Sequence, residues 1–342
     1  MTETQRKEPV IALLGQPNSG KSTLFNGLTG LKQHVGNWPG KTVEQKEGYF
    51  VRSNQRYTVV DLPGTYSLSA NSEEEIITRD YIAEGNADAV CILADASQLE
   101  RSLFMLADFA GIRTPAFLLL NMMDVAKDQG KTIDPQRLEK KLGIPVVAFS
   151  ATDVRHYDGF YRALDRVLRD RPLLDTWDLE QEYQKKEGFT GIKELMPQTG
   201  MGQYSDFWLA AKLMEGDIPV TARVKDLLKP EDRRALEQQL SQIKNGALLT
   251  GECKFAWIDR LLKGAVQGEK RTASLGKFDR IATSRRYGKP LAVAIILLGL
   301  VASFIPAMPF MVGGSLLPSL LTPMLTEGLT EVHAPQFLIG LI

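Results

Sequence analysis

Cysteine and histidine are scarce in this sequence, with two and three residues among 342. Cys91 and Cys253 lie far apart and form no C-x-x-C pair, so neither a disulfide framework nor a cysteine–histidine metal cluster is expected. Cys91 falls in the apolar run 89–94 and is expected to be a small, buried core residue. The cysteine pattern is therefore typical of a reducing compartment.

Net charge is also absent, because 41 Lys and Arg residues balance 41 Asp and Glu residues. No stripe of basic residues alternates with aromatic residues, so the sequence has no feature that would recruit nucleic acid. The polar amino terminus, residues 1–9, lacks the apolar region of a signal peptide. These absences leave a globular chain that is long enough for two or three domains.

The third absence is local, since no charged residue occurs between Pro290 and Thr326. This stretch can hold a membrane crossing of ~20 residues, and we expect a first transmembrane helix at about 290–312. Glu327 and Glu331 follow the stretch and basic residues precede it, so the positive-inside rule places the chain before Pro290 in the cytoplasm. The basic residues lie in an expected juxtamembrane linker, 277–289: Arg280, Arg285, Arg286 and Lys289.

Prolines interrupt the rest of the expected membrane region, 290–342. We expect a re-entrant or interfacial segment after the first helix, because proline breaks or kinks a helix. The apolar run 337–342 resembles the start of a second span, as in a fragment of a longer protein. A buried core helix of a soluble protein is the alternative. The prolines are Pro306, Pro309, Pro318 and Pro323.

Short apolar runs alternate with helical patterns through the first half of the chain. We expect strands at 10–14, 57–60, 89–93, 116–120 and 146–149. The alternation predicts an α/β domain over 1–171, with a mostly parallel sheet and helices on both faces. After about residue 172 only helical periodicity persists, which predicts an all-α domain over 172–276.

Residues Gly15–Ser22 read Gly-Gln-Pro-Asn-Ser-Gly-Lys-Ser, a complete G-x-x-x-x-G-K-S phosphate loop between an expected strand and an expected helix. Its backbone N–H groups would surround the phosphates, Lys21 would reach the β- and γ-phosphates, and Ser22 would ligate Mg²⁺. We therefore predict a nucleoside triphosphate site. The residues expected to build it are Gly15, Gln16, Pro17, Asn18, Ser19, Gly20, Lys21, Ser22 and Thr23.

Two further segments can complete a magnesium site. Asp61 begins an Asp-Leu-Pro-Gly segment at the end of an expected strand. Its carboxylate would hold Mg²⁺ through water, and the Gly64 N–H would donate to the γ-phosphate. Thr42 lies in the loop between the first helix and the next strand, and its hydroxyl would complete the coordination when triphosphate is bound. An ordinary solvated loop threonine is the alternative for Thr42.

The identity of the base is expected to depend on Asn121-Met122-Met123-Asp124, which follows the strand 116–120. The Asp124 carboxylate can accept from both N1–H and the exocyclic amine of guanine, whereas adenine offers no such pair of donors. Within Ser150-Ala151-Thr152, the Ala151 N–H can donate to guanine O6. The sequence therefore predicts a site for GTP and GDP, and a weak guanine preference would instead indicate an ATP-hydrolysing variant.

Four segments together resemble the bacterial ferrous iron transporter family FeoB: Gly15–Ser22, Val35–Glu44 with its Gly-Asn-Trp-Pro-Gly loop, Asp61–Leu68 and Asn121–Asp124. The resemblance implies a GTPase on the cytoplasmic face of the bacterial inner membrane. It further implies a helical domain, similar to a nucleotide-dissociation inhibitor, that joins the GTPase to a multi-pass iron permease. Lys41 departs from the apolar residue of the family pattern.

Hydrolysis is expected to be slow, because Thr65 stands where Ras-like proteins have a water-orienting glutamine. The resemblance implies that a potassium ion, held partly by Asn18, stabilises charge between the β- and γ-phosphates. A loop-bracing amide is the alternative for Asn18. Catalytic roles thus fall to Lys21, Asn18, Thr42 and Gly64.

The expected function is nucleotide-dependent gating or driving of Fe²⁺ uptake, with the iron ligands outside this chain. A membrane-tethered signalling switch that transports nothing is the alternative. The expected partners are guanine nucleotide, Fe²⁺ and the membrane, together with a small cytoplasmic accessory protein and a second copy of the chain.

Overall fold

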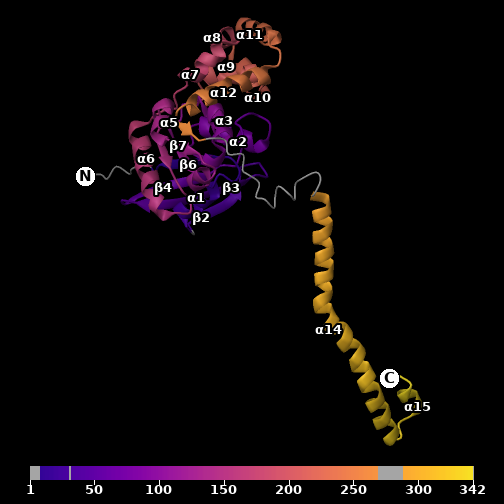
Figure 1. Ribbon diagram of the computed structural model, residues 1–342. Helices are drawn as coiled ribbons and strands as arrows, with labels where there is room; N and C mark the ends of the chain where they lie inside the picture. Colours follow the sequence, from indigo (N-terminus) through magenta and orange to yellow (C-terminus); the bar gives the residue numbers. More distant parts are fainter. Residues whose placement is uncertain (1–7, 31, 269–287, 342) are drawn as a thin grey trace. The chain divides into compact units, whose positions relative to one another are not determined.

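The computed structural model describes residues 8–30, 32–268 and 288–341. Contacts between residues group the chain into two compact units, Met1–Arg271 and Thr272–Ile342. Each unit is described by itself below, with the element labels of Figure 1.

A seven-stranded sheet forms the centre of the first unit, in the order β2-β3-β4-β1-β5-β6-β8. The strands from β4 to β8 pair in parallel, whereas β2 and β3 are antiparallel. All five strands expected from the sequence are present. The strands β2 and β3 were not predicted, because few of their residues are apolar. The strands are β1 Val10–Gly15, β2 Gln33–Asn37, β3 Glu44–Arg52, β4 Gln55–Asp61, β5 Ala89–Asp95, β6 Ala116–Asn121 and β8 Val146–Ala148.

Helices cover both faces of this sheet, as predicted. Because strand side chains alternate between faces, Ile11 and Leu13 join one apolar cluster while Ala12 and Leu14 join the other. The helices of the first cluster are α1 Lys21–Thr29 and α6 Tyr157–Asp170; those of the second are α2 Glu73–Ala83, α3 Leu99–Phe109 and α5 Pro135–Leu142. The short elements are η1 Ala96–Gln98, α4 Met123–Asp128, β7 Thr132–Ile133 and η2 Val154–His156.

The region after α6 is helical, as the periodicity predicts. Its buried residues Tyr183, Trp208 and Trp257 belong to the same apolar cluster as α2, α3 and α5, so the helical region shares the core of the sheet. A domain boundary near residue 172 therefore stays a prediction within one compact unit. The helices are α7 Trp177–Gln184, α8 Phe189–Glu194, α9 Asp206–Glu215, α10 Ile218–Leu227, α11 Pro230–Gln242 and α12 Gly246–Leu262; β9 Val266–Gln267 then pairs antiparallel with β7.

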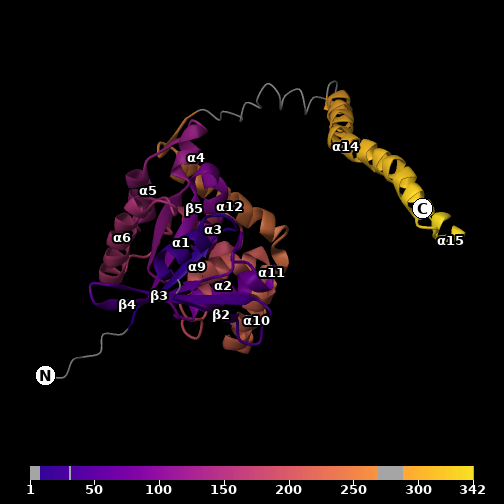
Figure 2. The same cartoon turned by 90° about the horizontal axis from the view of Figure 1, so that it is seen from below.

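The second unit contains the long helix α14 Gly288–Glu331 and the short helix α15 Gln336–Ile339. The expected break after residue 312 is not present: the backbone stays helical through Pro318 and Pro323. A proline removes one helical hydrogen bond and bends the helix, while the neighbouring bonds can hold. Figure 1 and Figure 2 both show α14 bending along its length.

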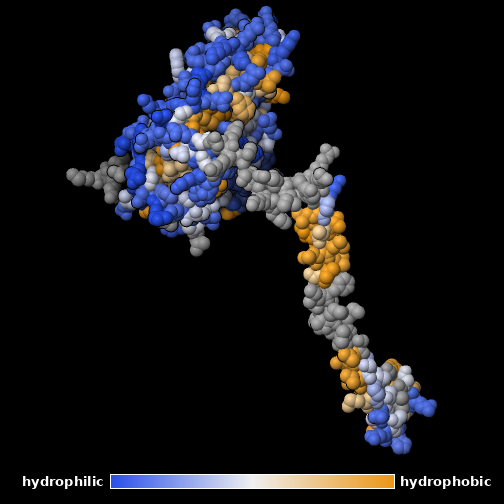
Figure 3. All heavy atoms as spheres, viewed as in Figure 1, coloured by the Kyte–Doolittle hydropathy of each residue, from blue (hydrophilic) through white to orange (hydrophobic). Residues whose placement is uncertain are grey.

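Figure 3 shows an apolar surface on the amino-terminal part of α14, where Leu298 is 74% exposed. Among the residues that the structure describes, no helix meets the length and hydropathy required to cross a membrane. The side chains of residues 304–313 lie outside the described set. The linker residues 277–287 lie outside it as well. The membrane helix at 290–312, the linker and the start of a second span therefore stay predictions.

Candidate functional site

The predicted nucleotide-binding segments meet at one edge of the sheet. The phosphate loop follows β1, Asp61 ends β4, Asn121 ends β6, and Ser150–Thr152 follow β8. These strands are parallel, so their carboxyl ends lie at the same edge, where open α/β sheets bind ligands.

The phosphate loop is a tight turn between β1 and α1. Asn18 and Gly20 adopt left-handed backbone conformations, with φ of 65° and 95°. Ser19 N donates to Gln16 O at 3.2 Å and closes the turn. Gly20 is the N-cap of α1 and provides no side-chain cap. The first backbone N–H groups of α1 are therefore directed toward the space that the loop surrounds, an arrangement suited to an anion.

Lys21 and Asp61 form a buried ion pair in this loop. Lys21 Nζ contacts Asp61 Oδ1 and also donates to Leu62 O, and the two charged side chains are only 10% and 6% exposed. Two segments that are 40 residues apart in sequence thus place an ammonium and a carboxylate at one point. A triphosphate and its magnesium ion require these two charges.

Gly64 and Thr65 follow Asp61 beside the phosphate loop. A Cβ on Gly64 would lie 3.3 Å from Pro17 N, so the two loops are close neighbours. Thr65 is only 3% exposed. Its Oγ1 has no hydrogen-bond partner in the part of the chain that the structure describes.

The loop that carries Thr42 is attached to α2. Trp38 is buried and packs edge-on against Tyr81 of α2, with the ring centroids 5.3 Å apart. Lys41 Nζ lies 2.8 Å from Glu73 Oε1, also in α2, which gives the unusual lysine a partner. Thr42 itself is exposed. Its side chain has no hydrogen bond to Ser22 or Asp61 in the described structure, and its role as a magnesium ligand stays a prediction.

Asn121 connects the base-recognition segments to the phosphate loop. Its Nδ2 donates to Ser19 O at 2.9 Å, and its Oδ1 accepts from Ala151 N at 3.1 Å. A Cβ on Gly20 would lie 2.1 Å from Asn121 Nδ2, so the loop needs glycine there. The Ala151 N–H expected to face guanine O6 is thus engaged by Asn121 in this structure.

Asp124 lies in a different environment from Asn121. Met122 has a left-handed backbone with φ of 60°, and α4 begins at the next residue. This turn leaves Asp124 exposed in the first turn of α4. On the neighbouring loop, the hydroxyls of Ser150 and Thr152 lie 3.2 Å apart.

A buried charge cluster behind the site was not predicted. We call Asp108, Lys212, Glu215 and Lys254 the Asp108 cluster. Asp108 Oδ1 accepts from Lys212 Nζ at 2.9 Å and from Lys254 Nζ at 2.7 Å. Burial opposes ionisation of Asp108, but the two lysine charges outweigh it and hold its pKa below the ordinary value. No local sequence pattern predicts this cluster, because its members are up to 146 residues apart.

The Asp108 cluster holds the segment that follows Gly64. Asp108 Oδ2 accepts from Leu68 N at 3.2 Å. Ser69 Oγ accepts from Lys212 Nζ at 2.8 Å and donates to Glu215 Oε1 at 2.9 Å. Since Lys212 and Glu215 lie in α9, the loop after Asp61 is fastened to the helical region.

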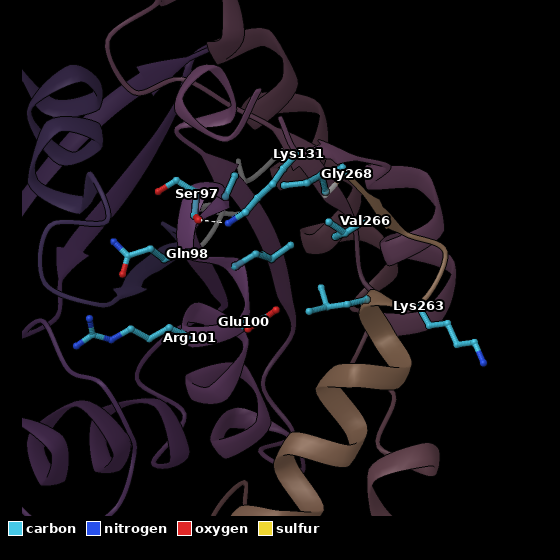
Figure 4. Close-up of a pocket in the computed structure, with 12 residues that line it drawn as sticks. Ser97, Gln98, Glu100, Arg101, Lys131, Lys263, Val266 and Gly268 are labelled. Carbon is cyan, nitrogen blue, oxygen red and sulfur yellow. Dashed lines mark hydrogen bonds between the residues drawn. The ribbon is translucent and has the colours of Figure 1, made fainter. Parts of the chain in front are cut away.

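One cavity borders the phosphate loop, and another lies beside η1 and is lined by other residues. One, of about 540 Å³, includes Gln16 of the phosphate loop, Tyr66 and Phe255. The other, of about 550 Å³, lies between η1, the start of α3 and the segment from α12 to β9 (Figure 4). Figure 4 shows Lys131 bonded to the Ser97 carbonyl at its edge. None of the predicted nucleotide-binding residues lines this second cavity.

A phosphate loop, a strand-end aspartate and an Asn-x-x-Asp segment, together at the carboxyl edge of a mostly parallel sheet, define a P-loop GTPase fold. Residues 9–164 match the family model described as ferrous iron transport protein B, FeoB_N. The chain belongs to the FeoB family.

Two curated relatives show the extent of the match. The chain is 34% identical over 300 residues to the Fe(2+) transporter FeoB of Salmonella choleraesuis (strain SC-B67). It is 33% identical over 309 residues to that of Escherichia coli (strain K12). Each match covers 85% of this chain and 38% of the relative. The chain therefore spans well under half the length of these relatives.

Solved structures match about three quarters of the chain. The GMPPNP form of the T. maritima FeoB cytosolic domain is 30% identical, with a TM-score of 0.64, and the match covers 76% of this chain and 99% of that one. A GDP-bound variant of the S. thermophilus FeoB G-domain is 33% identical, with a TM-score of 0.66, and covers 76% and 100%.

Proposed function

We propose that this chain binds and hydrolyses GTP with Mg²⁺, and that it is the cytoplasmic part of an inner-membrane ferrous iron transporter whose nucleotide state gates or drives Fe²⁺ uptake. The proposal rests on one observation: Lys21, Asp61 and Asn121 lie together at one edge of the sheet. The Lys21–Asp61 ion pair and the hydrogen bonds of Asn121 to Ser19 and Ala151 hold these segments there. The similar solved structures, which are described as the GMPPNP form and a GDP-bound variant of FeoB domains, support the proposal.

The residues of the phosphate loop fit a triphosphate and its magnesium ion. Glycine at position 20 allows the left-handed turn and the approach of Asn121, and Lys21 lies with Asp61 at the start of α1. In the proposal Lys21 would hold the β- and γ-phosphates, and Ser22, Thr42 and, through water, Asp61 would hold the metal. Magnesium, when bound, neutralises charge on the phosphate oxygens.

Thr42 and Gly64 are proposed to respond to the presence of the γ-phosphate. Thr42 is exposed in a loop whose fixed points are Trp38 and Lys41 on α2. Gly64 lies beside Pro17. Both segments therefore contact α2 or the phosphate loop, and a triphosphate that orders one would bias the other.

The helical region is proposed to carry this change toward the membrane. The Asp108 cluster joins the loop after Gly64 to α9 and α12. A second buried pair joins α2 to the start of α10, where Arg79 lies 2.9 Å from Asp217. Buried, paired charges have few alternative arrangements. Movement of the loop after Gly64 would therefore displace the helices that these pairs join to it.

The test of nucleotide identity is competition against a fluorescent GDP bound to the 342-residue chain. We expect GDP and GTP to compete about 10³-fold better than ADP and ATP, because the Asp124 carboxylate can accept from both N1–H and the exocyclic amine of guanine and adenine offers no such pair of donors. Lys21→Met should abolish triphosphate binding. Equal competition by adenine nucleotides, or full binding by Lys21→Met, would contradict the proposal.

The proposed potassium ion is tested separately. Asn18 is exposed in the phosphate loop with a left-handed backbone, so its side chain is free to face a bound nucleotide. We expect faster GTP turnover in KCl than in NaCl for the parent chain, and no salt preference for Asn18→Ala. Equal parent rates in the two salts would remove potassium from the mechanism.

A further inference from the structure

Tyr157 opens α6 shortly after the segment Ser150–Thr152, and it belongs to none of the nucleotide-binding motifs. It is 7% exposed. Its ring packs on Phe149, with the ring centroids 5.4 Å apart. Its Oη donates to Ala151 O at 3.1 Å. The side chain thus fastens the loop that carries Ala151 to α6.

The same hydroxyl reaches α1, the helix that begins in the phosphate loop. A Cβ on Gly27 would lie 1.9 Å from Tyr157 Oη and 2.9 Å from its Cζ. No side chain at position 27 could coexist with Tyr157 in this position. Gly27 therefore leaves the space that the hydroxyl occupies between the Ala151 carbonyl and α1.

Ala151 is held from its other side by Asn121. Ala151 N donates to Asn121 Oδ1 at 3.1 Å, and Asn121 Nδ2 donates to Ser19 O at 2.9 Å. Tyr157, Ala151, Asn121 and Ser19 therefore form one connected series from α6 to the phosphate loop. All four are at most 8% exposed, so water competes little for these hydrogen bonds.

We propose that Tyr157 is a positioning residue that fixes the distance between the base-binding loop and the phosphate loop, and thereby the residence time of guanine nucleotide. The inference rests on the guanine-nucleotide function proposed above. A nucleotide contacts both loops at once, so a scaffold that already holds them at the right spacing reduces the ordering cost of binding. Tyr157 lies outside the segments proposed to hold the phosphates, and its hydroxyl is engaged by Ala151 O.

The test is Tyr157→Phe in the full chain, which removes only the hydroxyl. We expect fluorescent GDP to dissociate about fivefold faster, because a neutral hydrogen bond contributes about 1 kcal/mol. Competition by inorganic pyrophosphate, which occupies the phosphate loop alone, should stay unchanged. This split separates positioning of the base from general damage to the fold.

Tyr161→Phe is the matched control. Tyr161 lies one turn further along α6, and its hydroxyl has no hydrogen bond within the described residues. Its ring instead supports Arg52, whose guanidinium carbon is 4.8 Å from the ring centroid. Removing this hydroxyl should leave GDP dissociation at the parent rate.

Gly27→Ala tests the same contact by changing its α1 side. Alanine favours a helix interior, but its Cβ would displace the Tyr157 hydroxyl, so GDP should again dissociate faster. Parent-like dissociation in Tyr157→Phe, or an equal loss of GDP and pyrophosphate affinity, would overturn the inference. A parent chain without guanine preference would overturn the proposed function itself, and the inference with it.

Discussion

At the scale of single residues, Gly20 and Gly30 offer a matched comparison at the two ends of α1. Both have a positive φ, 95° and 58°, but only Gly20 is in the left-handed helical region, since Gly30 has a ψ of -124°. A Cβ on Gly20 would lie 2.1 Å from Asn121 Nδ2, whereas a Cβ on Gly30 would meet nothing within 4 Å. Both backbones therefore favour glycine, and the close approach of another side chain occurs at Gly20 but not at Gly30.

We expect both Gly20→Ala and Gly30→Ala to lower the free energy of unfolding, because the backbone at each position is strained once a Cβ is added. Gly20→Ala should also weaken GDP binding at least tenfold, since its Cβ displaces Asn121. Urea titration and fluorescent GDP binding measure the two effects. Equal behaviour of the two variants would show that the Asn121 contact has no role in binding.

Lys41 and Trp38 show how one loop can carry two kinds of contact. The Lys41–Glu73 pair is exposed, with side chains 43% and 41% accessible, so we expect Lys41→Ala to change the free energy of unfolding by less than about 1 kcal/mol. Trp38 is 8% exposed against Tyr81. Trp38→Ala should cost about 3–5 kcal/mol. Thermal unfolding of both variants checks the difference.

At the scale of elements, the Asp108 cluster joins α3, α9 and α12. We expect Asp108→Asn to lower the free energy of unfolding by about 3–5 kcal/mol, because Lys212 and Lys254 would stay buried without their counter-charge. Asp165→Asn is the control: its carboxylate pairs with Arg52 at the surface and is 45% exposed. That change should cost less than about 1 kcal/mol. Comparable losses in the two variants would contradict the account of the cluster.

The same cluster predicts a pH dependence. The folded-state pKa of Asp108 and of Glu215 lies below the ordinary values of 3.8 and 4.5, since the nearby lysines outweigh the effect of burial. A depressed carboxyl pKa stabilises the fold above the unfolded-state pKa, and this stability is lost as the pH falls through the folded-state pKa. The parent should therefore lose stability below about pH 4.5 more steeply than Asp108→Asn. Parallel curves from urea titrations between pH 7 and pH 3 would refute this.

At the scale of the whole molecule, the sheet and the helical region of the first unit share one apolar core. Trp208 of α9 joins this core, and its Nε1 donates to Asp108 O of α3 at 2.7 Å. We therefore expect amides of β5, β6, α9 and α12 to exchange with deuterium through one global opening. Excess GDP, at about 100 times its dissociation constant, should raise the protection of all four by about 2.7 kcal/mol. If the amides of α9 and α12 exchanged through an opening of lower free energy that GDP does not affect, the sheet and the helical region would be two independent units.

The nucleotide-binding motifs illustrate what could be predicted and what could not. Gly15–Ser22, Asp61–Gly64 and Asn121–Asp124 are local patterns whose chemistry follows from residue type and from position after an apolar strand. Trp38 was visible as part of a loop, but its burial against Tyr81 was not. The strands β2 and β3 were missed because their pairing, rather than apolar alternation, makes them strands.

The sequence by itself determined the phosphate loop, the five parallel strands and the helical character of the region after α6, because these depend on local spacing and on apolar periodicity. Only the tertiary structure decided that Asn121 holds Ser19 and Ala151 together, that Tyr157 fills the space at Gly27, and that Asp108 is buried with two lysines. These contacts join residues that are far apart in the chain, and the folded core alone brings them together and removes the water that would weaken them.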